Sequence, residues 1–213
     1  MPCSHRTHEN CDHGDEDRAD YDSGGDSLYA EVNAAASVVL NAQPPNDVAR
    51  NVLRTKEEMM NETLPYLCSD ADEQLLIGVK FMAPVKLKSI CVLGRGVNSG
   101  SNPRTLKLFI NKESMDFDAA SSTTPLQVME LAPRQAGDAL DLPTKFTKFQ
   151  NVQTLWMFVS DNYGENRTEI QYIGFKGITT KHKREAVVTV YELRPQAAEN
   201  DGLQEHNLPP FVG

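Results

Sequence analysis

The stretch KFTKFQNVQTLWMFVSDNYGENRTEIQYIGFKG, residues 145–177, decides the fold. Its run 154–160 (TLWMFVS) is apolar on both faces, which is typical of a strand in the middle of a sheet. A second strand-like run follows at 169–176 (EIQYIGFK), and Gly164 lies between the two runs as a turn signal. Two strands that follow each other without an intervening helix favour antiparallel pairing.

Similar strand patterns extend on both sides of this stretch. In the run 85–93, Val85, Leu87, Ser89, Cys91 and Leu93 alternate with Lys86, Lys88, Ile90 and Val92. We expect the first half of this run to be half-exposed and the second half to be buried on both faces. Further strands are expected around 106–110 and at 186–193 (AVVTVYEL). Long amphipathic helices are not evident, although 46–62 allows a short helix with Val48, Val52 and Leu53 on one side. The pattern predicts an all-β fold, an antiparallel sandwich or barrel.

Composition divides the chain into a body and two tails. Residues 1–27 are poor in apolar side chains and are expected to be disordered, as is the C-terminal tail 196–213, which leaves one domain over 28–195. The net charge is −9, and residues 1–26 contribute −6 of it, because they hold eight acidic and two basic residues. Such a field repels a phosphate backbone, so we expect no nucleic-acid partner.

The chain has no apolar run approaching the roughly 20 residues that span a bilayer, and it begins with the polar MPCSHRTHEN. We therefore expect no membrane partner, no signal peptide and a cytoplasmic protein, with the nucleus as a second compartment.

The four cysteines form no CxxC pair, and no disulfide framework is expected. A monomer is the expected state.

The N-terminal tail contains a tract of metal-ligating residue types: Cys3, His5, His8, Cys11 and His13. Thiolate and imidazole are ligands for Zn²⁺, Ni²⁺ or Cu⁺. The spacing fits no zinc-finger class, and a fixed site would have to order a polar segment. Two interpretations stay open, a metal site and a solvated tail that takes up zinc adventitiously, and no resident cofactor is expected.

Two charged clusters occur in the body. Asp70, Asp72 and Glu73 precede a strand, and they either hold Ca²⁺ or, as we expect, shape a turn through hydrogen bonds to the backbone. The basic cluster lies between two predicted strands and consists of Lys181, His182, Lys183 and Arg184. It is either a docking point for an acidic partner surface or a solvated hairpin tip.

Residues for catalysis are scarce. The body contains a single histidine, His182, and no GxSxG, HExxH or phosphate-loop motif occurs, so we expect no enzyme. Trp156, the sole tryptophan, could serve as a sugar-stacking platform, but its apolar neighbours favour a core position. Cys91, between Ile90 and Val92, is expected to be an inert buried thiol.

Several blocks together resemble one known family, the PITH domain. They are SDADEQLLI (69–77) continuing through FMAPVKLKSICVLG (81–94), Asn102-Pro103-Arg104 with LKLFINKESMDFD (106–118), and the block 145–177. The resemblance covers residues from about 28 to 195. It implies a β-sandwich jelly roll similar to galactose-binding domains, and association with the 26S proteasome. In the thioredoxin-like relatives a thioredoxin domain precedes this module. The sequence given shows no such domain and no CxxC, so we expect that their redox activity does not carry over.

Three functions therefore remain for comparison. The first is a non-catalytic protein-interaction module that binds proteasome subunits. The second is a small-ligand or carbohydrate-binding β-sandwich, which needs exposed aromatic rings and convergent polar groups in a concave site. The third is a metal-binding accessory protein that acts through the N-terminal Cys/His tract.

Overall fold

The computed structural model describes residues 25–45, 47–135 and 139–180. Its strands are β1 (Asp26–Ser27), β2 (Val38–Leu40), β3 (Leu67–Cys68), β4 (Leu75–Gly94), β5 (Pro103–Ile110), β6 (Gln127–Glu130), β7 (Asp141–Pro143), β8 (Val152–Asn162) and β9 (Glu169–Thr179). The helical segments are α2 (Phe117–Ser122) and the 3₁₀ turns η1 (Tyr29–Glu31), η2 (Ala49–Asn51), η3 (Lys56–Glu58) and η4 (Phe146–Lys148). In these ranges every helix is too short or too polar to be a membrane span.

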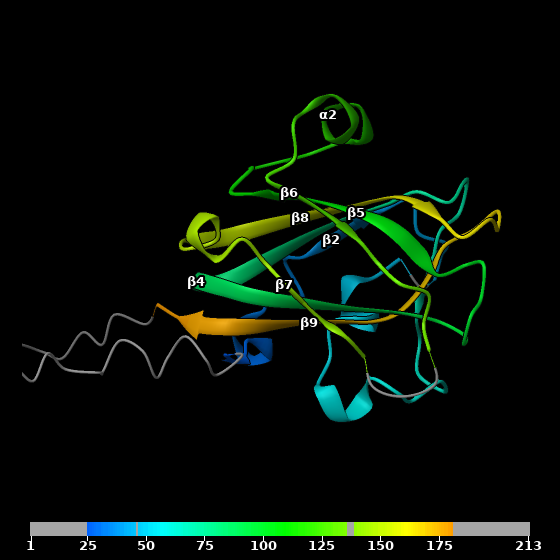
Figure 1. The fold of residues 1–213 in the computed structure, drawn as a ribbon, viewed down its shortest axis with the longest axis horizontal. Coiled ribbons are helices and arrows are strands. Elements are labelled where there is room, and N and C mark those ends of the chain that lie inside the picture. The colour runs from blue at the N-terminus through cyan, green and yellow to red at the C-terminus, as the bar shows by residue number, and fades with distance from the viewer. Residues whose placement is uncertain (1–24, 46, 136–138, 181–213) are drawn as a thin grey trace, which may run out of the picture. The chain divides into compact units, whose positions relative to one another are not determined.

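Strand β4 belongs to two layers. Residues 75–80 pair with β8, and residues 85–94 pair with β9. One layer therefore has the strand order β2-β4-β8-β5-β6, and the other has β7-β4-β9 with β1 and β3 on the far side of β9. All these pairings are antiparallel, and Figure 1 shows the two layers with β4 passing between them. The predicted antiparallel β-sandwich is confirmed.

The main core lies between the layers. Along β8, Leu155, Met157 and Val159 point into it, as the two-residue period of a strand requires. From the other layer, Ile173 and Phe175 of β9 join the same cluster. The run 154–160 is therefore a central strand buried on both faces, as its sequence predicts.

A second cluster covers the outer face of the first layer. Trp156 is only 4% exposed there, and α2 lies over this face (Figure 1). The indole Nε1 donates a hydrogen bond to the carbonyl of Lys112 at 3.0 Å, and Phe117 of α2 meets Phe158 edge to face. The predicted core position of Trp156 is confirmed, with the difference that this core is the outer cluster under α2.

The second half of the run 85–93 is buried on both faces, as its sequence predicts. Between Leu87 and Ser89 the strand β4 advances two residues while β9 advances one, which is a β-bulge. Beyond the bulge Ile90 faces the main core, whereas Cys91 and Leu93 join a third cluster on the outside of the second layer. The bulge exchanges the two faces of the strand, so residues of one alternating set lie on different faces before and after it.

The short helix expected over 46–62 is also wrong. The described part of this segment forms the two 3₁₀ turns η2 and η3. Leu53 forms a parallel bridge with Ile173, and the Ile173 amide donates to the carbonyl of Val52 at 2.8 Å. Pairing with β9 keeps the chain extended at this point, so the expected helix does not form. Val52 and Leu53 are still buried.

Several expectations lie outside the described residues. These are the strand 186–193, the C-terminal tail 196–213 and most of the N-terminal tail 1–27. At the end of that N-terminal segment, β1 pairs with β9.

Gly78 lies directly opposite Trp156 in the sheet, and a Cβ at Gly78 would lie 2.7 Å from the indole ring. We predict that Gly78→Ala lowers the free energy of unfolding by about 1–3 kcal/mol, because a rigid ring in a packed cluster has little room to move. Urea denaturation measures the change. Trp156→Leu in the same chain removes the clash, so the double variant should lose less than the sum of the two single losses. Strict additivity would contradict the contact.

Candidate functional site

A cavity of about 270 Å³ opens where β4 ends and β5 begins. Its third side is formed by residues 131–135 and by Ala139, Leu140 and Leu142. The lining residues are Val92, Leu93, Gly94, Asn102, Pro103, Leu131, Ala132, Pro133, Arg134, Gln135, Ala139, Leu140 and Leu142. The wall is mostly aliphatic, with a few polar side chains, which is the usual composition of a ligand pocket.

Asn102 is a buried polar residue in this wall, with 1% of its surface exposed. Its Nδ2 donates to the carbonyl of Gly96 at 3.2 Å, which orients the amide. Its Oδ1 has no hydrogen-bond partner among the described residues. A Cβ at Gly94 would lie 2.0 Å from this oxygen, so glycine is required there to let the amide pack against the strand.

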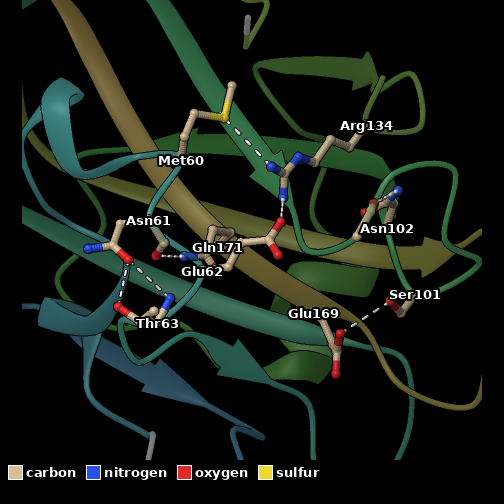
Figure 2. A network of polar contacts seen from close by, with 10 residues as sticks. Met60, Asn61, Glu62, Thr63, Ser101, Asn102, Arg134, Glu169 and Gln171 are labelled. Carbon is tan, nitrogen blue, oxygen red and sulfur yellow. Dashed lines mark hydrogen bonds and ion pairs between the residues drawn. The ribbon is translucent and has the colours of Figure 1, made fainter. Parts of the chain in front are cut away.

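Arg134 supplies the second buried polar group, and its side chain is 8% exposed. Figure 2 shows its guanidinium directed toward the turn that contains Met60 and Glu62. Nη1 donates to Glu62 Oε1 at 2.9 Å, and Nη2 lies 3.6 Å from Met60 Sδ. Nε has no partner in the described part of the chain. The ion pair offsets the charge of the arginine, while its Nε–H group is buried without a partner among the described residues.

The loops around the cavity are bonded to one another. The Asn98 amide donates to the carbonyl of Arg134 at 2.8 Å, and Gln135 Nε2 donates to Asn98 Oδ1 at 3.0 Å. The hydroxyl of Tyr163 donates to the carbonyl of Leu131 at 2.5 Å. These bonds hold the 94–100 loop, the segment after β6 and the loop after β8 in one arrangement.

The turn that carries Glu62 is fixed by hydrogen bonds of its own. Asn61 Oδ1 accepts hydrogen bonds from the amide of Thr63 at 3.1 Å and from its hydroxyl at 2.6 Å. Gln171 of β9 is fully buried, and its Nε2 donates to the carbonyl of Asn61 at 2.8 Å (Figure 2). This support fixes the position from which Glu62 reaches Arg134.

The acidic cluster that precedes β4 forms a turn. Asp72 Oδ1 accepts from the amide of Gln74 at 3.0 Å and from Asn41 Nδ2 at 2.7 Å, and Ser69 Oγ accepts from the amide of Thr168 at 2.9 Å. The bond between Asp72 and Gln74 agrees with the turn-shaping interpretation, whereas the Ser69 bond joins this segment to Thr168, just before β9. Among the described residues no group of three or more His, Cys, Asp or Glu side chains is placed to hold a metal ion.

Both site predictions with a charged or metal-ligating pattern lie outside the described residues. They are the tract Cys3, His5, His8, Cys11 and His13, and the cluster Lys181, His182, Lys183 and Arg184. Both stay predictions.

Sequence patterns did not identify the cavity. Asn102 and Arg134 come from different loops, and each looks like an ordinary polar loop residue. The available signal was the Gly-rich run 94–100 followed by Asn102-Pro103, which indicates a close approach of backbone but no partner.

The model of the PITH domain family matches residues 18–195 of the chain. "PITH domain-containing protein 1" of Dictyostelium discoideum is 32% identical over 201 residues, which cover 94% of this chain and 92% of that protein. The protein of the same name in Mus musculus is 33% identical over 184 residues, covering 86% and 83%.

Solved structures resemble the fold at low sequence identity. A family 89 glycoside hydrolase from Clostridium perfringens matches with a TM-score of 0.50 and 11% identity, over 73% of this chain and 15% of that one. An F-lectin (fucolectin) from striped bass, Morone saxatilis, matches with a TM-score of 0.50 and 10% identity, over 72% of this chain and 50% of that one. These neighbours confirm the predicted galactose-binding-like jelly roll, and at this identity they speak for the fold alone.

Cys91 lies beside Tyr172 in the third cluster, and burial raises the pKa of its thiol from 9.0 to about 12. Burial likewise raises the pKa of the Tyr172 hydroxyl from 10.0 to about 12. A thiol that stays protonated at neutral pH is a poor nucleophile, in agreement with the predicted inert cysteine.

These pKa shifts predict that stability falls in alkali. The unfolded chain releases the Cys91 proton near pH 9 while the folded chain keeps it to about pH 12, so the stabilisation is complete below pH 9 and is lost as pH rises toward 12. Urea unfolding of wild type and Cys91→Ala across this range measures the effect. The variant should show a slope smaller by up to about 1.4 kcal/mol per pH unit. Parallel curves would contradict a thiol that stays neutral in the fold.

Proposed function

This chain belongs to the PITH domain family, and on that premise we propose that it is a non-catalytic protein-interaction module that associates with the 26S proteasome. The choice of partner comes from the family, which is named for interacting with the proteasome. The proposal implies a protein of the cytoplasm or the nucleus.

The observation that carries the binding role is the surface around the cavity. Val97, Leu140 and Tyr163 are large apolar side chains that stay exposed, and each lies on one of the loops that frame the opening. An apolar patch beside a partly apolar cavity favours contact with another molecule. The loops that present it are bonded together, so a partner would meet a preformed surface.

The cavity wall supports the non-catalytic part of the proposal. Its described lining residues include no Ser, Cys, His, Asp or Glu, so this wall holds neither a nucleophile nor a general base. The one charged group in it, Arg134, is already paired with Glu62.

A carbohydrate-binding role is less well supported by the same wall. The titles of the solved neighbours name a glycoside hydrolase and a fucolectin, and those activities belong to those proteins. Sugar recognition commonly relies on an aromatic platform with converging polar groups. The described lining contains no aromatic ring, and Trp156 is buried beneath α2.

We predict that the immobilised full-length chain binds purified 26S proteasomes, and that reversing the basic cluster weakens this binding. In the variant, Lys181, Lys183 and Arg184 are changed to Glu. Electrostatic attraction to an acidic surface accelerates association and depends on salt, so the variant should bind about tenfold more weakly at low ionic strength and respond less to added salt. Biolayer interferometry at several salt concentrations measures both effects.

The matched control reverses the same number of charges elsewhere, at the exposed residues Lys80, Lys112 and Lys148. It should bind as wild type does. Equal weakening in both variants would remove the docking role of the basic cluster, and failure of the wild-type chain to bind proteasomes would overturn the proposed partner.

A further inference from the structure

We propose that the acidic tract of the N-terminal tail, residues 12–22, lies against a lysine face of the second layer and must leave this face before an acidic partner can bind there. The lysine face consists of Lys86, Lys88 and Lys145. The inference goes beyond the proposed function and does not depend on the proteasome as a partner, because its occupant is a segment of the chain itself.

Positive charge is concentrated on the strands of the sandwich. The chain from residue 74 to residue 112, which covers β4 and β5, holds seven basic residues and no acidic one. The range 142–160, which includes η4 and most of β8, holds two lysines and no acidic residue. These parts of the body are therefore positively charged, although the whole chain carries −9.

Contacts of β4 bring the three lysines of the lysine face together. Both neighbours of Lys86 in the chain lie in the main core, so Lys86 points to the outer side of the second layer. The carbonyl of Lys88 accepts a hydrogen bond from the amide of Thr144 at 2.8 Å, which places Lys145 beside this strand. Lys145 is exposed, and Lys86 and Lys88 are partly exposed. The three ammonium groups thus belong to one accessible surface.

Nearby acidic side chains are engaged or lie on the other side of the sandwich. Asp141 of β7 forms an ion pair with Lys176, so it offsets the lysine face little. Lys107 lies on the outer side of the first layer, over a ring of the cluster that α2 covers. The first turn of α2 supplies acidic groups on that side, Asp116 and Asp118. The second layer is therefore the more attractive side for a further acidic segment.

The acidic tract joins the body beside the lysine face. It holds six acidic residues and one arginine, a net charge of −5. The described chain begins at Gly25, and Asp26 of β1 pairs with Gly177 of β9. Gly177 pairs in turn with Leu87 of β4, so β1, β9 and β4 lie side by side. Two strand spacings are about 10 Å, a distance that the three residues from Asp22 to Gly25 can span when extended.

Charge and attachment together favour this contact. The Debye length is about 8 Å at physiological ionic strength, so charges at such separations still attract one another. Attachment to the body also gives the tract a local concentration on the order of millimolar at the face, so that a weak attraction suffices for occupancy. An acidic partner has to displace the tract, and the contact should weaken as salt is added.

Paramagnetic NMR broadening tests the contact in the full-length chain. Cys68 and Cys91 are buried, so in a Cys3→Ser chain a thiol-reactive spin label attaches to Cys11, next to the tract. At about 10 mM salt we expect broadening of the amide signals of the lysine face. At about 500 mM salt most of this broadening should be lost, because the Debye length falls from about 30 Å to below about 5 Å.

Two sets of substitutions remove one side of the contact each, and both should reduce the broadening at low salt to its level at high salt. The tail-neutralised chain carries Asp15→Asn, Asp17→Asn, Asp20→Asn and Asp22→Asn, which leaves the body unchanged. The face-neutralised chain carries Lys86→Gln, Lys88→Gln and Lys145→Gln. The matched control removes three charges from the first layer through Lys80→Gln, Lys107→Gln and Lys112→Gln. It should keep the wild-type broadening.

A short polyglutamate peptide serves as the probe for an acidic partner. It should bind the tail-neutralised chain about fivefold more tightly than wild type, because the tract no longer competes for the lysine face. The difference should vanish when the three substitutions of the face-neutralised chain are present in both proteins. Fluorescence anisotropy of the labelled peptide at low salt measures both effects.

The inference is overturned if the broadening does not respond to salt or to either set of substitutions, or if polyglutamate binds the wild-type and tail-neutralised chains equally. Broadening of an isotope-labelled chain by a separate spin-labelled chain would assign the tract to a second copy and would overturn it as well. These measurements contain no proteasome, so their failure and the failure of the proposed function are observed separately.

Discussion

The fold depends on the continuity of β4 through both layers of the sandwich. Its first part pairs with β8 and its second part with β9, and Val85 pairs with both. Because one strand supplies hydrogen bonds to both layers, the layers cannot separate without breaking its ladders. The irregular register between residues 80 and 85 and the bulge after Leu87 give the strand the bend that this sharing requires.

The position of the cavity follows from the same strand. β4 ends at Gly94, and the absence of a Cβ there admits the amide of Asn102 against the backbone. The bulge turns Leu93 to the outside and leaves Val92 facing inward, so both sides of the strand contribute to the wall. Loops from β6 and β8 then close around it through hydrogen bonds to backbone carbonyls. A rigid strand end therefore carries a surface that is assembled from separate loops.

The sequence pattern predicts the sandwich, because the strand-like runs 154–160 and 169–176 follow each other without an intervening helix. It fails where a tertiary contact changes the local backbone. The bulge at Lys88 exchanges the faces of Cys91 and Ile90, and the pairing of Leu53 with Ile173 replaces a helix by 3₁₀ turns. The cavity could not be predicted for a related reason. Arg134 in its wall is held by an ion pair with Glu62, which lies 72 residues away in the chain. No local pattern encodes such a contact.

Proteins that share this fold can differ in the side chains that their loops present. The solved neighbours include a fucolectin, yet in this chain the large aromatic side chains of the first layer, Trp156 and Phe158, lie beneath α2. The cavity at the end of β4 is instead lined mostly by aliphatic side chains, among them leucines and prolines. The described wall of this cavity therefore lacks the aromatic platform on which sugar recognition commonly relies.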